Sequence, residues 1–262
     1  MAKLYYQDAY VTLYHGDCRD MHEVADGVVD MVLTDPPWMV TKQIRCKWDW
    51  FASEDEYYAF TRDWLTEAVR CLRNKGHLVS FFDQYKATKL IEIAEELGLI
   101  MRQYLYWLKT NPTPRVRKDG DFMVALEYAC WFTKGTKSGA IFNYHLGQHA
   151  NYVEAPIPTH TTKLDGKRVH PTQKPVNVLM TWIKYLTNAG DLVLDPMCGS
   201  GSTLLAAKLL ERRAIGYERD ESYCKAASNR LRQSVMPLTK LSIPQLQKGN
   251  FKPKVNKLPW DI

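Results

Sequence analysis

The sequence predicts an α/β fold in which a mostly parallel sheet is covered by helices on both faces. Two observations support this class. Short apolar runs rich in β-branched residues alternate along the chain with longer stretches of helical periodicity, a pattern typical of parallel sheets. Two of the runs also end in an acid followed by proline, at Asp35 and Asp195. Because such sheets bind ligands at the carboxyl ends of their strands, we expect both acids to line one crevice.

The individual elements can be assigned in chain order. Strands are expected at 10–14, 28–33, 77–82, 101–108, 123–132, 191–195 and 214–218. Helices are expected from 53 to about 72, at 87–97 and 174–186, after the glycine loop at 199–201, and from 221 to about 235. Ser53 and Glu56 form a capping box at the start of the first helix, and Gly98 closes the second. The span 134–169 is expected to be mainly irregular.

Composition narrows the class of protein. Of the 262 residues, 45% are hydrophobic, which is enough for a substantial core. No apolar run reaches about 18 residues and the first residues lack a signal-peptide core, so a soluble, intracellular protein is expected. The six scattered cysteines are expected to be free thiols. No metal site is expected, since the pair His145 and His149 has a glycine between its members and no acid nearby.

The net charge of +6 is unevenly distributed. Residues 102–174 contain 11 Lys and Arg against 5 Asp and Glu, and residues 237–262 contain 5 against 1. The remainder of the chain is net negative. A polyanionic partner would explain a basic middle segment and a basic tail. The alternative is a solvated face with a basic tail.

The stretch DPMCGSGST, at 195–203, follows an expected strand and opens a helix. Its glycines allow a ligand to approach the backbone, but no lysine follows them as a P-loop requires, and Leu204 replaces the third glycine of a dinucleotide-binding loop. Glu218 ends the next strand, where an acid typically binds ribose hydroxyls. Asp195 could pair with a ligand ammonium. A ligand with ribose and ammonium groups and no phosphate fits S-adenosylmethionine better than NAD or ATP.

Taken together, the motifs resemble the amino-methyltransferases of DNA in the permuted arrangement called the β group. DPPW comes first, at 35–38, followed by a recognition segment, HPTQKP at 170–175 and the glycine loop. HGDC at 15–18, YWLKTNPTP, ALEYACWF and GYERD support the resemblance, which extends from about Tyr10 to Leu231. It implies one Rossmann-like, S-adenosylmethionine-dependent methyltransferase domain over 1–262. Within it, a target-recognition region is expected at about 102–170 and a basic tail at 237–262.

The resemblance also assigns residues to roles. It implies a catalytic tetrad of Asp35, Pro36, Pro37 and Trp38. It implies that the cofactor S-adenosylmethionine is bound by Asp17, Cys18, Asp35, Gln173, Lys174, Asp195, Met197, Gly199, Gly201, Ser202, Thr203 and Glu218. Asp17 and Cys18 match the pair that contacts the adenine of the cofactor, and Gln173 and Lys174 match a turn near its methionine end. Met197 departs from the usual phenylalanine but fills similar apolar space.

The expected activity is site-specific methylation of adenine N6 in double-stranded DNA, of the kind used in restriction–modification. Aspartate at the head of the tetrad favours adenine over cytosine N4 in this family, and cytosine N4 remains the main alternative. An RNA adenine methyltransferase and a catalytically silent DNA-binding homologue are further alternatives. Relatives often form dimers, so a homodimer is compatible with the resemblance. Candidate DNA contacts are Lys109, Asn111, Arg115, Arg117, Lys118, Lys163, Lys167 and Arg168.

Overall fold

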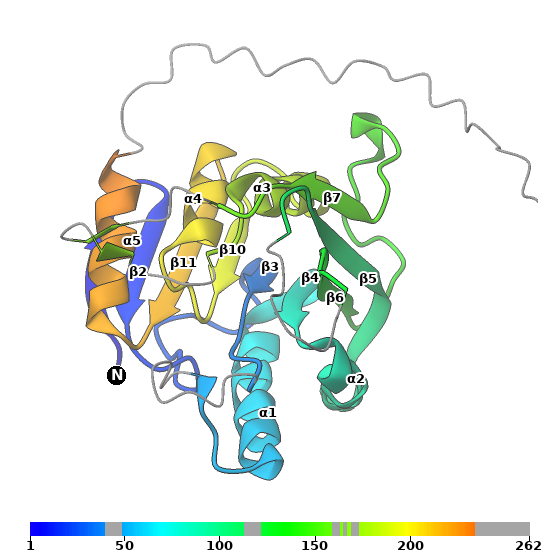
Figure 1. Cartoon of the computed structure of the whole chain (residues 1–262), viewed down its shortest axis with the longest axis horizontal. Helices are drawn as coiled ribbons and strands as arrows, with labels where there is room; N and C mark the ends of the chain where they lie inside the picture. Colours follow the sequence, from blue (N-terminus) through cyan, green and yellow to red (C-terminus); the bar gives the residue numbers. More distant parts are fainter. Residues whose placement is uncertain (40–48, 113–121, 159–162, 165–166, 169–172, 234–262) are drawn as a thin grey trace, which may run out of the picture.

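The computed structural model describes residues 1–39, 49–112, 122–158, 163–164, 167–168 and 173–233. Its centre is a nine-stranded sheet with the strand order β1-β2-β11-β10-β3-β4-β6-β5-β7 (Figure 1). Five adjacent strands run parallel to one another: β2 (Val11–His15), β11 (Arg213–Glu218), β10 (Leu192–Asp195), β3 (Val29–Thr34) and β4 (Leu72–Phe82). The predicted α/β class with a mostly parallel sheet is therefore confirmed.

Antiparallel strands extend the sheet on both sides. At one edge β1 (Lys3–Gln7) pairs with β2. On the other side β6 (Leu126–Lys134) pairs with both β4 and β5 (Leu99–Lys109), and β7 (Tyr152–Ala155) lies parallel to β5 at the far edge. A separate two-stranded ladder consists of β8 (Lys163–Leu164) and β9 (Lys167–Arg168).

Helices cover both faces of the sheet (Figure 1). One face packs against α1 (Glu54–Cys71) and α2 (Ala87–Glu96), which follows the short 3₁₀ turn η2 (Gln84–Lys86). The opposite face packs against α3 (Val176–Leu186), α4 (Ser202–Leu209) and α5 (Glu221–Gln233). The turn η3 (Tyr144–Leu146) lies between β6 and β7 in the chain. Half of the capping box forms as expected, since the Ser53 hydroxyl accepts from the Glu56 amide at 3.2 Å, whereas Glu56 accepts from the amide of Ala52, the residue before the cap, at 2.7 Å.

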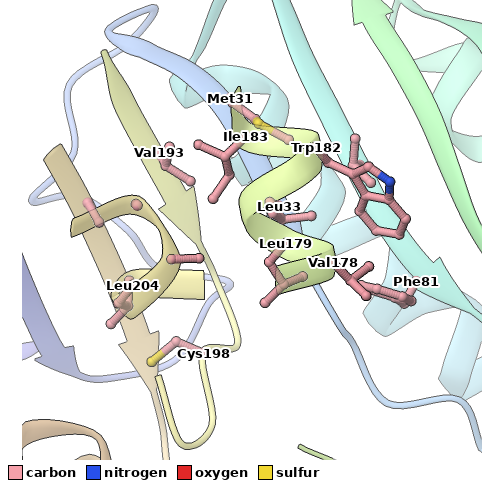
Figure 2. Close-up of a cluster of buried hydrophobic side chains, with 14 of the residues drawn as sticks. Met31, Leu33, Phe81, Val178, Leu179, Trp182, Ile183, Val193, Cys198 and Leu204 are labelled. Carbon is pink, nitrogen blue, oxygen red and sulfur yellow. The ribbon is translucent and has the colours of Figure 1, made fainter. Parts of the chain in front are cut away.

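The core under α3 holds the middle of the sheet in place (Figure 2). Four apolar side chains of α3 recur at helical spacing: Val178, Leu179, Trp182 and Ile183. They pack with buried side chains of β3, β4 and β10, which include Met31, Leu33, Phe81 and Val193. Close packing of α3 against β3, β4 and β10 therefore holds the strands that carry the expected site residues in place.

Several elements differ from the sequence-based assignment. The first helix ends at Cys71, and β4 starts at Leu72 instead of His77. In the pairing of β3 with β4, Val29 lies opposite Leu72 and Met31 opposite His77, so residues 73–76 form a bulge. The sequence-based assignment began the strand after this bulge. The short edge strands β1 and β7 and the β8–β9 ladder were not predicted. They satisfy their backbone groups through long-range pairing, which local periodicity does not report.

The region expected to recognise the target, at about 102–170, includes most of β5 and all of β6 and β7, which are strands of the central sheet. Its role in target recognition stays a prediction. The basic tail at 237–262 lies outside the described residues. Within the described part, no helix is long and apolar enough to cross a membrane, and the cysteines at 18, 71, 130, 198 and 224 are free.

Candidate active site

Four acids follow or end four neighbouring strands at one edge of the sheet. Asp17 comes after β2, Glu218 ends β11, Asp195 ends β10 and Asp35 comes directly after β3. Since these strands are parallel and adjacent in the order β2-β11-β10-β3, their carboxyl ends meet at the same edge. The sequence-based expectation that Asp35 and Asp195 line one crevice is met, because both line the same pocket.

The crevice consists of two adjoining pockets. One has a volume of about 630 Å³ and is lined by Asp17, Cys18, Glu218 and several apolar side chains. The other has a volume of about 400 Å³ and is lined by Gln173, Lys174, Asp195 and the residues of the glycine loop. Asp35, Met197 and Gly199 line both pockets and therefore mark the point where they meet. The structure brings nearly all of the expected cofactor and catalytic residues together around this point.

Asp35 has an asymmetric environment. Its Oδ2 atom accepts a hydrogen bond from Lys174 Nζ at 2.5 Å, whereas Oδ1 is buried and has no hydrogen-bond partner among the described residues. The side chain keeps 24% of its surface exposed, toward the crevice. Burial raises the pKa of Asp35 to about 6, although the adjacent Lys174 ammonium acts in the opposite direction. The Trp38 side chain also acts on this carboxyl as a hydrogen-bond donor, so Oδ1 is enclosed and a ligand N–H would have to take the place of that contact.

Trp38 is held beside Asp35 by a residue that sequence reasoning missed. Asp49 Oδ1 accepts hydrogen bonds from the amides of Trp38 at 2.6 Å and of Met39 at 2.7 Å. Met39 has a positive φ of 54°, which is uncommon for a residue with a side chain. Asp49 is buried, so its carboxylate fixes the end of the tetrad from inside the protein. In the sequence it stood between two tryptophans with no motif to single it out.

Two buried carboxylates test whether the crevice fits S-adenosylmethionine. Burial raises the pKa of Asp195 to about 7 and raises that of Glu218. Neither forms an ion pair within the described part of the chain. Backbone amides already occupy part of each carboxylate: Met197 donates to Asp195 at 3.2 Å, and Gly199 donates to Glu218 at 3.0 Å. A ligand ammonium and ribose hydroxyls are the kinds of group that such acids can still bind, so the residues fit this ligand.

The glycine loop packs closely against α5. Gly201 begins α4 in the left-handed region, at φ 76°, and a Cβ atom there would lie 3.1 Å from Cβ of Ala227. Arg230 of α5 donates to the Ser200 carbonyl at 3.3 Å and to the Ser202 hydroxyl at 2.9 Å. Helix α5 therefore holds one side of the loop, and other residues of the loop line the crevice.

The remaining expected cofactor residues are also in place. Asp17 lines the larger pocket and is paired with Arg19 at 2.7 Å, which holds the pKa of Asp17 below its usual value. Gln173 accepts from the Ser200 hydroxyl at 3.4 Å. Three further residues line the larger pocket and were not predicted: Phe60, Arg219 and Tyr223. Arg219 belongs to the motif GYERD, which was the available clue to it, whereas Phe60 and Tyr223 had no recognisable signal in the sequence.

The expected DNA contacts are described only in part. The structure does not support a phosphate contact for Lys109, because its side chain is only 12% exposed and is paired with Glu127 at 2.9 Å. Asn111 is exposed, and its Oδ1 accepts from the Ile157 amide at 2.6 Å. Arg115, Arg117 and Lys118 lie outside the described residues. Only the backbone is described for the ladder that contains Lys163, Lys167 and Arg168.

Comparison with known proteins agrees with this geometry. Residues 29–229 match the family model described as DNA methylase, which covers N6 and N4 methyltransferases. The chain belongs to this DNA methylase family. It is therefore an S-adenosylmethionine-dependent DNA methyltransferase, and the resemblance to the β-group amino-methyltransferases is confirmed.

Individual relatives support the same assignment. The chain is 27% identical to the type II methyltransferase M2.MboI of Moraxella bovis, with 95% of this chain and 94% of the relative covered. It is 28% identical to the type II methyltransferase M.HinfI of Haemophilus influenzae, with 89% and 71% covered. Among solved structures, the M1.HpyAVI–SAM complex has a TM-score of 0.68 and 27% identity, over 84% of this chain and 98% of the other. The PvuII cytosine-N4-specific DNA methyltransferase has a TM-score of 0.74 at 21% identity, over 87% and 88%, which is a likeness of fold alone.

Proposed function

We propose that this DNA methylase methylates adenine N6 within a specific sequence of duplex DNA. The observation that supports it most directly is the position of the Asp35 carboxyl, which lies beside Trp38 and lines both pockets where they meet. A base inside a duplex cannot reach this point, so the target base has to turn out of the helix. Aspartate at the head of the tetrad favours adenine through the family resemblance, and cytosine N4 is the competing product.

The proposed chemistry assigns tasks to three residues of the tetrad: Asp35, Pro36 and Trp38. Bound S-adenosylmethionine supplies a methyl group on a positively charged sulfur, and the S–CH₃ bond breaks as the new N–CH₃ bond forms. The exocyclic amine of adenine is a poor nucleophile because its lone pair is delocalised into the ring. Asp35 Oδ1 accepts one N–H bond and the Pro36 carbonyl accepts the other, which leaves the lone pair free. The surplus proton leaves to water or through Asp35.

Trp38 and the developing charge account for the rest of the proposed step. The indole of Trp38 stacks on the extruded base, an interaction worth about 1–3 kcal/mol that offsets part of the cost of unstacking. Positive charge moves from sulfur to the amine during the transfer. The Asp35 carboxylate stabilises that charge where it develops.

We also propose how the crevice holds the cofactor. Glu218 accepts from the ribose hydroxyls, and Asp17 with the Cys18 backbone contacts the adenine. Asp195, Gln173 and the glycine loop surround the methionine end. The residues that line the two pockets support this division, since Asp17, Cys18 and Glu218 belong to one pocket and Gln173 and Asp195 to the other.

The DNA-facing residues and the cellular setting stay part of the proposal. The basic residues of the middle segment that would contact phosphates are Arg115, Arg117, Lys118, Lys163, Lys167 and Arg168. Asn111 would face the DNA as well. A DNA substrate places the protein inside the cell, and a homodimer is one assembly in which it could act.

Asp35→Asn tests the proposal. With radiolabelled S-adenosylmethionine and duplex DNA, we expect the methyl-transfer rate to fall by at least about a hundredfold, because the amide stabilises the developing charge far less. Cofactor binding measured by calorimetry should change little. Hydrolysis of the labelled DNA should release N6-methyladenine.

The matched control is Asp55→Asn, an exposed residue in the first turn of α1, which should keep the wild-type rate. If the labelled product were N4-methylcytosine, the target base would be cytosine and not adenine. Full activity of Asp35→Asn would refute the proposed role of the tetrad.

A further inference from the structure

Four side chains of alternating charge form a chain that ends at Asp35. Lys174 Nζ lies 2.5 Å from Asp35 Oδ2 and 3.2 Å from Glu127 Oε2. Lys109 Nζ lies 2.9 Å from the other oxygen, Glu127 Oε1. The four residues come from different elements, since Lys109 ends β5, Glu127 is in β6, Lys174 immediately precedes the α3 cap and Asp35 follows β3.

Three of these charged side chains are largely buried, so each has lost hydration free energy that the ion pairs have to offset. The exposed fractions of the side chains are 7% for Lys174, 16% for Glu127 and 12% for Lys109. Buried ion pairs are often no more stabilising than apolar residues of similar size, so stability alone does not explain why charged residues occupy these positions. The Lys174 ammonium also lies 5.0 Å from the ring centres of Trp38 and of Phe81, which places it between the tetrad and β4.

We propose that Lys174 is a positioning residue that keeps Asp35 ionised and occupies Oδ2, so that Oδ1 alone faces the target amine, while Glu127 and Lys109 hold Lys174 in that position. This inference rests on the proposed catalytic role of Asp35. It gives Lys174 a different task from the cofactor contact that the motif HPTQKP suggested. It also gives Lys109 a task inside the protein in place of a DNA contact.

The groups around Asp35 determine the sign of each substitution. Lys174 faces Asp35 from the residue before the α3 cap, and its positive charge lowers the pKa of that carboxyl. Glu127 from β6 is negative and raises the pKa of Asp35. Asp195 from β10 and Asp35 are like charges, and Asp35 raises the pKa of Asp195. Removing Lys174 should therefore favour protonated Asp35, whereas removing the negative charge of Glu127 should favour the ionised form.

The test is the pH dependence of a single turnover, with enzyme saturated by S-adenosylmethionine and duplex DNA. Saturation with the cofactor keeps its binding from contributing to the profile. For Lys174→Gln we expect the acid limb of the rate to move up by about one pH unit or more. For Glu127→Gln we expect it to move down. A substitution that merely loosened the fold would lower the rate at every pH and would not move the two limbs in opposite directions.

Controls separate this inference from the proposed function. Lys184→Gln changes an exposed lysine on α3 and should keep the wild-type profile. Thermal melting identifies a variant that does not fold; if Lys174→Gln fails, the downward shift of Glu127→Gln decides alone. An unchanged limb in Glu127→Gln, or shifts of both variants in the same direction, would overturn the inference. If Asp35→Asn is inactive at the same time, the proposed function stands and only the role of Lys174 is lost.

Discussion

At the scale of single residues, buried carboxylates without a cation give the crevice its chemical character. Asp195 is only 3% exposed, and its burial raises its pKa to about 7 despite hydrogen bonding from Thr203. Close to neutral pH, a substantial fraction of this carboxyl is therefore protonated before the ligand binds. The proposed contact with the methionine ammonium would favour the ionised form.

Cofactor affinity should consequently depend on pH. The free protein binds a proton at Asp195 below about pH 7, and the complex releases it, so affinity should rise as the pH increases from 5.5 to 7.5. The expected loss on acidification is up to about tenfold per pH unit below the pKa of Asp195. Isothermal titration in two buffers of different ionisation enthalpy, at pH 6, should detect proton release.

Asp195→Asn is the variant that assigns this proton. It should bind the cofactor more weakly at pH 7.5 and with a flatter pH dependence. Asp35→Asn serves as the comparison, because Asp35 also titrates in this range. Proton uptake on binding, or the full wild-type pH dependence in Asp195→Asn, would contradict the proposed contact.

At the scale of elements, α3 connects the core to the site. Its apolar face packs on the strands that carry Asp35 and Asp195, and Lys174 precedes its Pro175 cap. Figure 2 shows Ile183 among Met31, Leu33 and Val193, and Ile183 is not among the residues that line the two pockets. The packing of the helix on the sheet therefore determines the position of Lys174 relative to Asp35.

Ile183→Ala should destabilise the protein without altering the chemistry directly. The side chain is fully buried, so its truncation leaves a cavity, and we expect a loss of about 2–5 kcal/mol in the free energy of unfolding. Chemical denaturation measures this loss. The neighbouring, exposed Lys184→Ala should stay within about 0.5 kcal/mol of the wild type, and an equal loss in both variants would argue against the packing described for α3.

At the scale of the whole molecule, the sheet holds together segments that are far apart in the chain. His77 shows how this is done between β4, β6 and the segment after β6. Its Nδ1 accepts from Trp131 Nε1 at 3.1 Å, and its Nε2 lies 2.7 Å from the Ile141 carbonyl. This pairing fits the neutral tautomer with the proton on Nε2, and burial lowers the pKa of His77 to about 4.

Acid should therefore weaken the fold through His77. In the unfolded chain this histidine has its ordinary pKa of 6.5, so between pH 6.5 and about 4 the unfolded state binds more protons than the folded state. The contribution of His77 is complete above pH 6.5 and declines as the pH falls, by up to about 3 kcal/mol at pH 4. Denaturation curves at pH 7.5, 6 and 5 measure this decline.

Comparison with His77→Gln isolates this contribution. Buried Asp35 and Asp195 have raised pKa values and act with the opposite sign, so the difference between the two proteins is the informative quantity. The glutamine variant should lose less stability than the wild type between pH 7.5 and 5. Identical declines would exclude His77 as the source.

The sequence by itself determined the catalytic end of the fold. Local periodicity identified β3, β10 and β11, and the acids at or after their ends had to share one edge once these strands were parallel. The order of DPPW, HPTQKP and the glycine loop identified the family. These features are local: each depends on a few neighbouring residues and on the fixed geometry of a strand end.

Only the tertiary structure decided what surrounds Asp35. Glu127 lies beside Lys174, the partner of Asp35, and Lys109 lies beside Glu127, because β6 inserts between β4 and β5 and pairs antiparallel with both. Asp49 accepts from the amide of Trp38 although it stands 11 residues later in the chain. The physical reason is that register and strand order depend on packing between distant segments, whereas a run of sequence encodes only its own periodicity and faces.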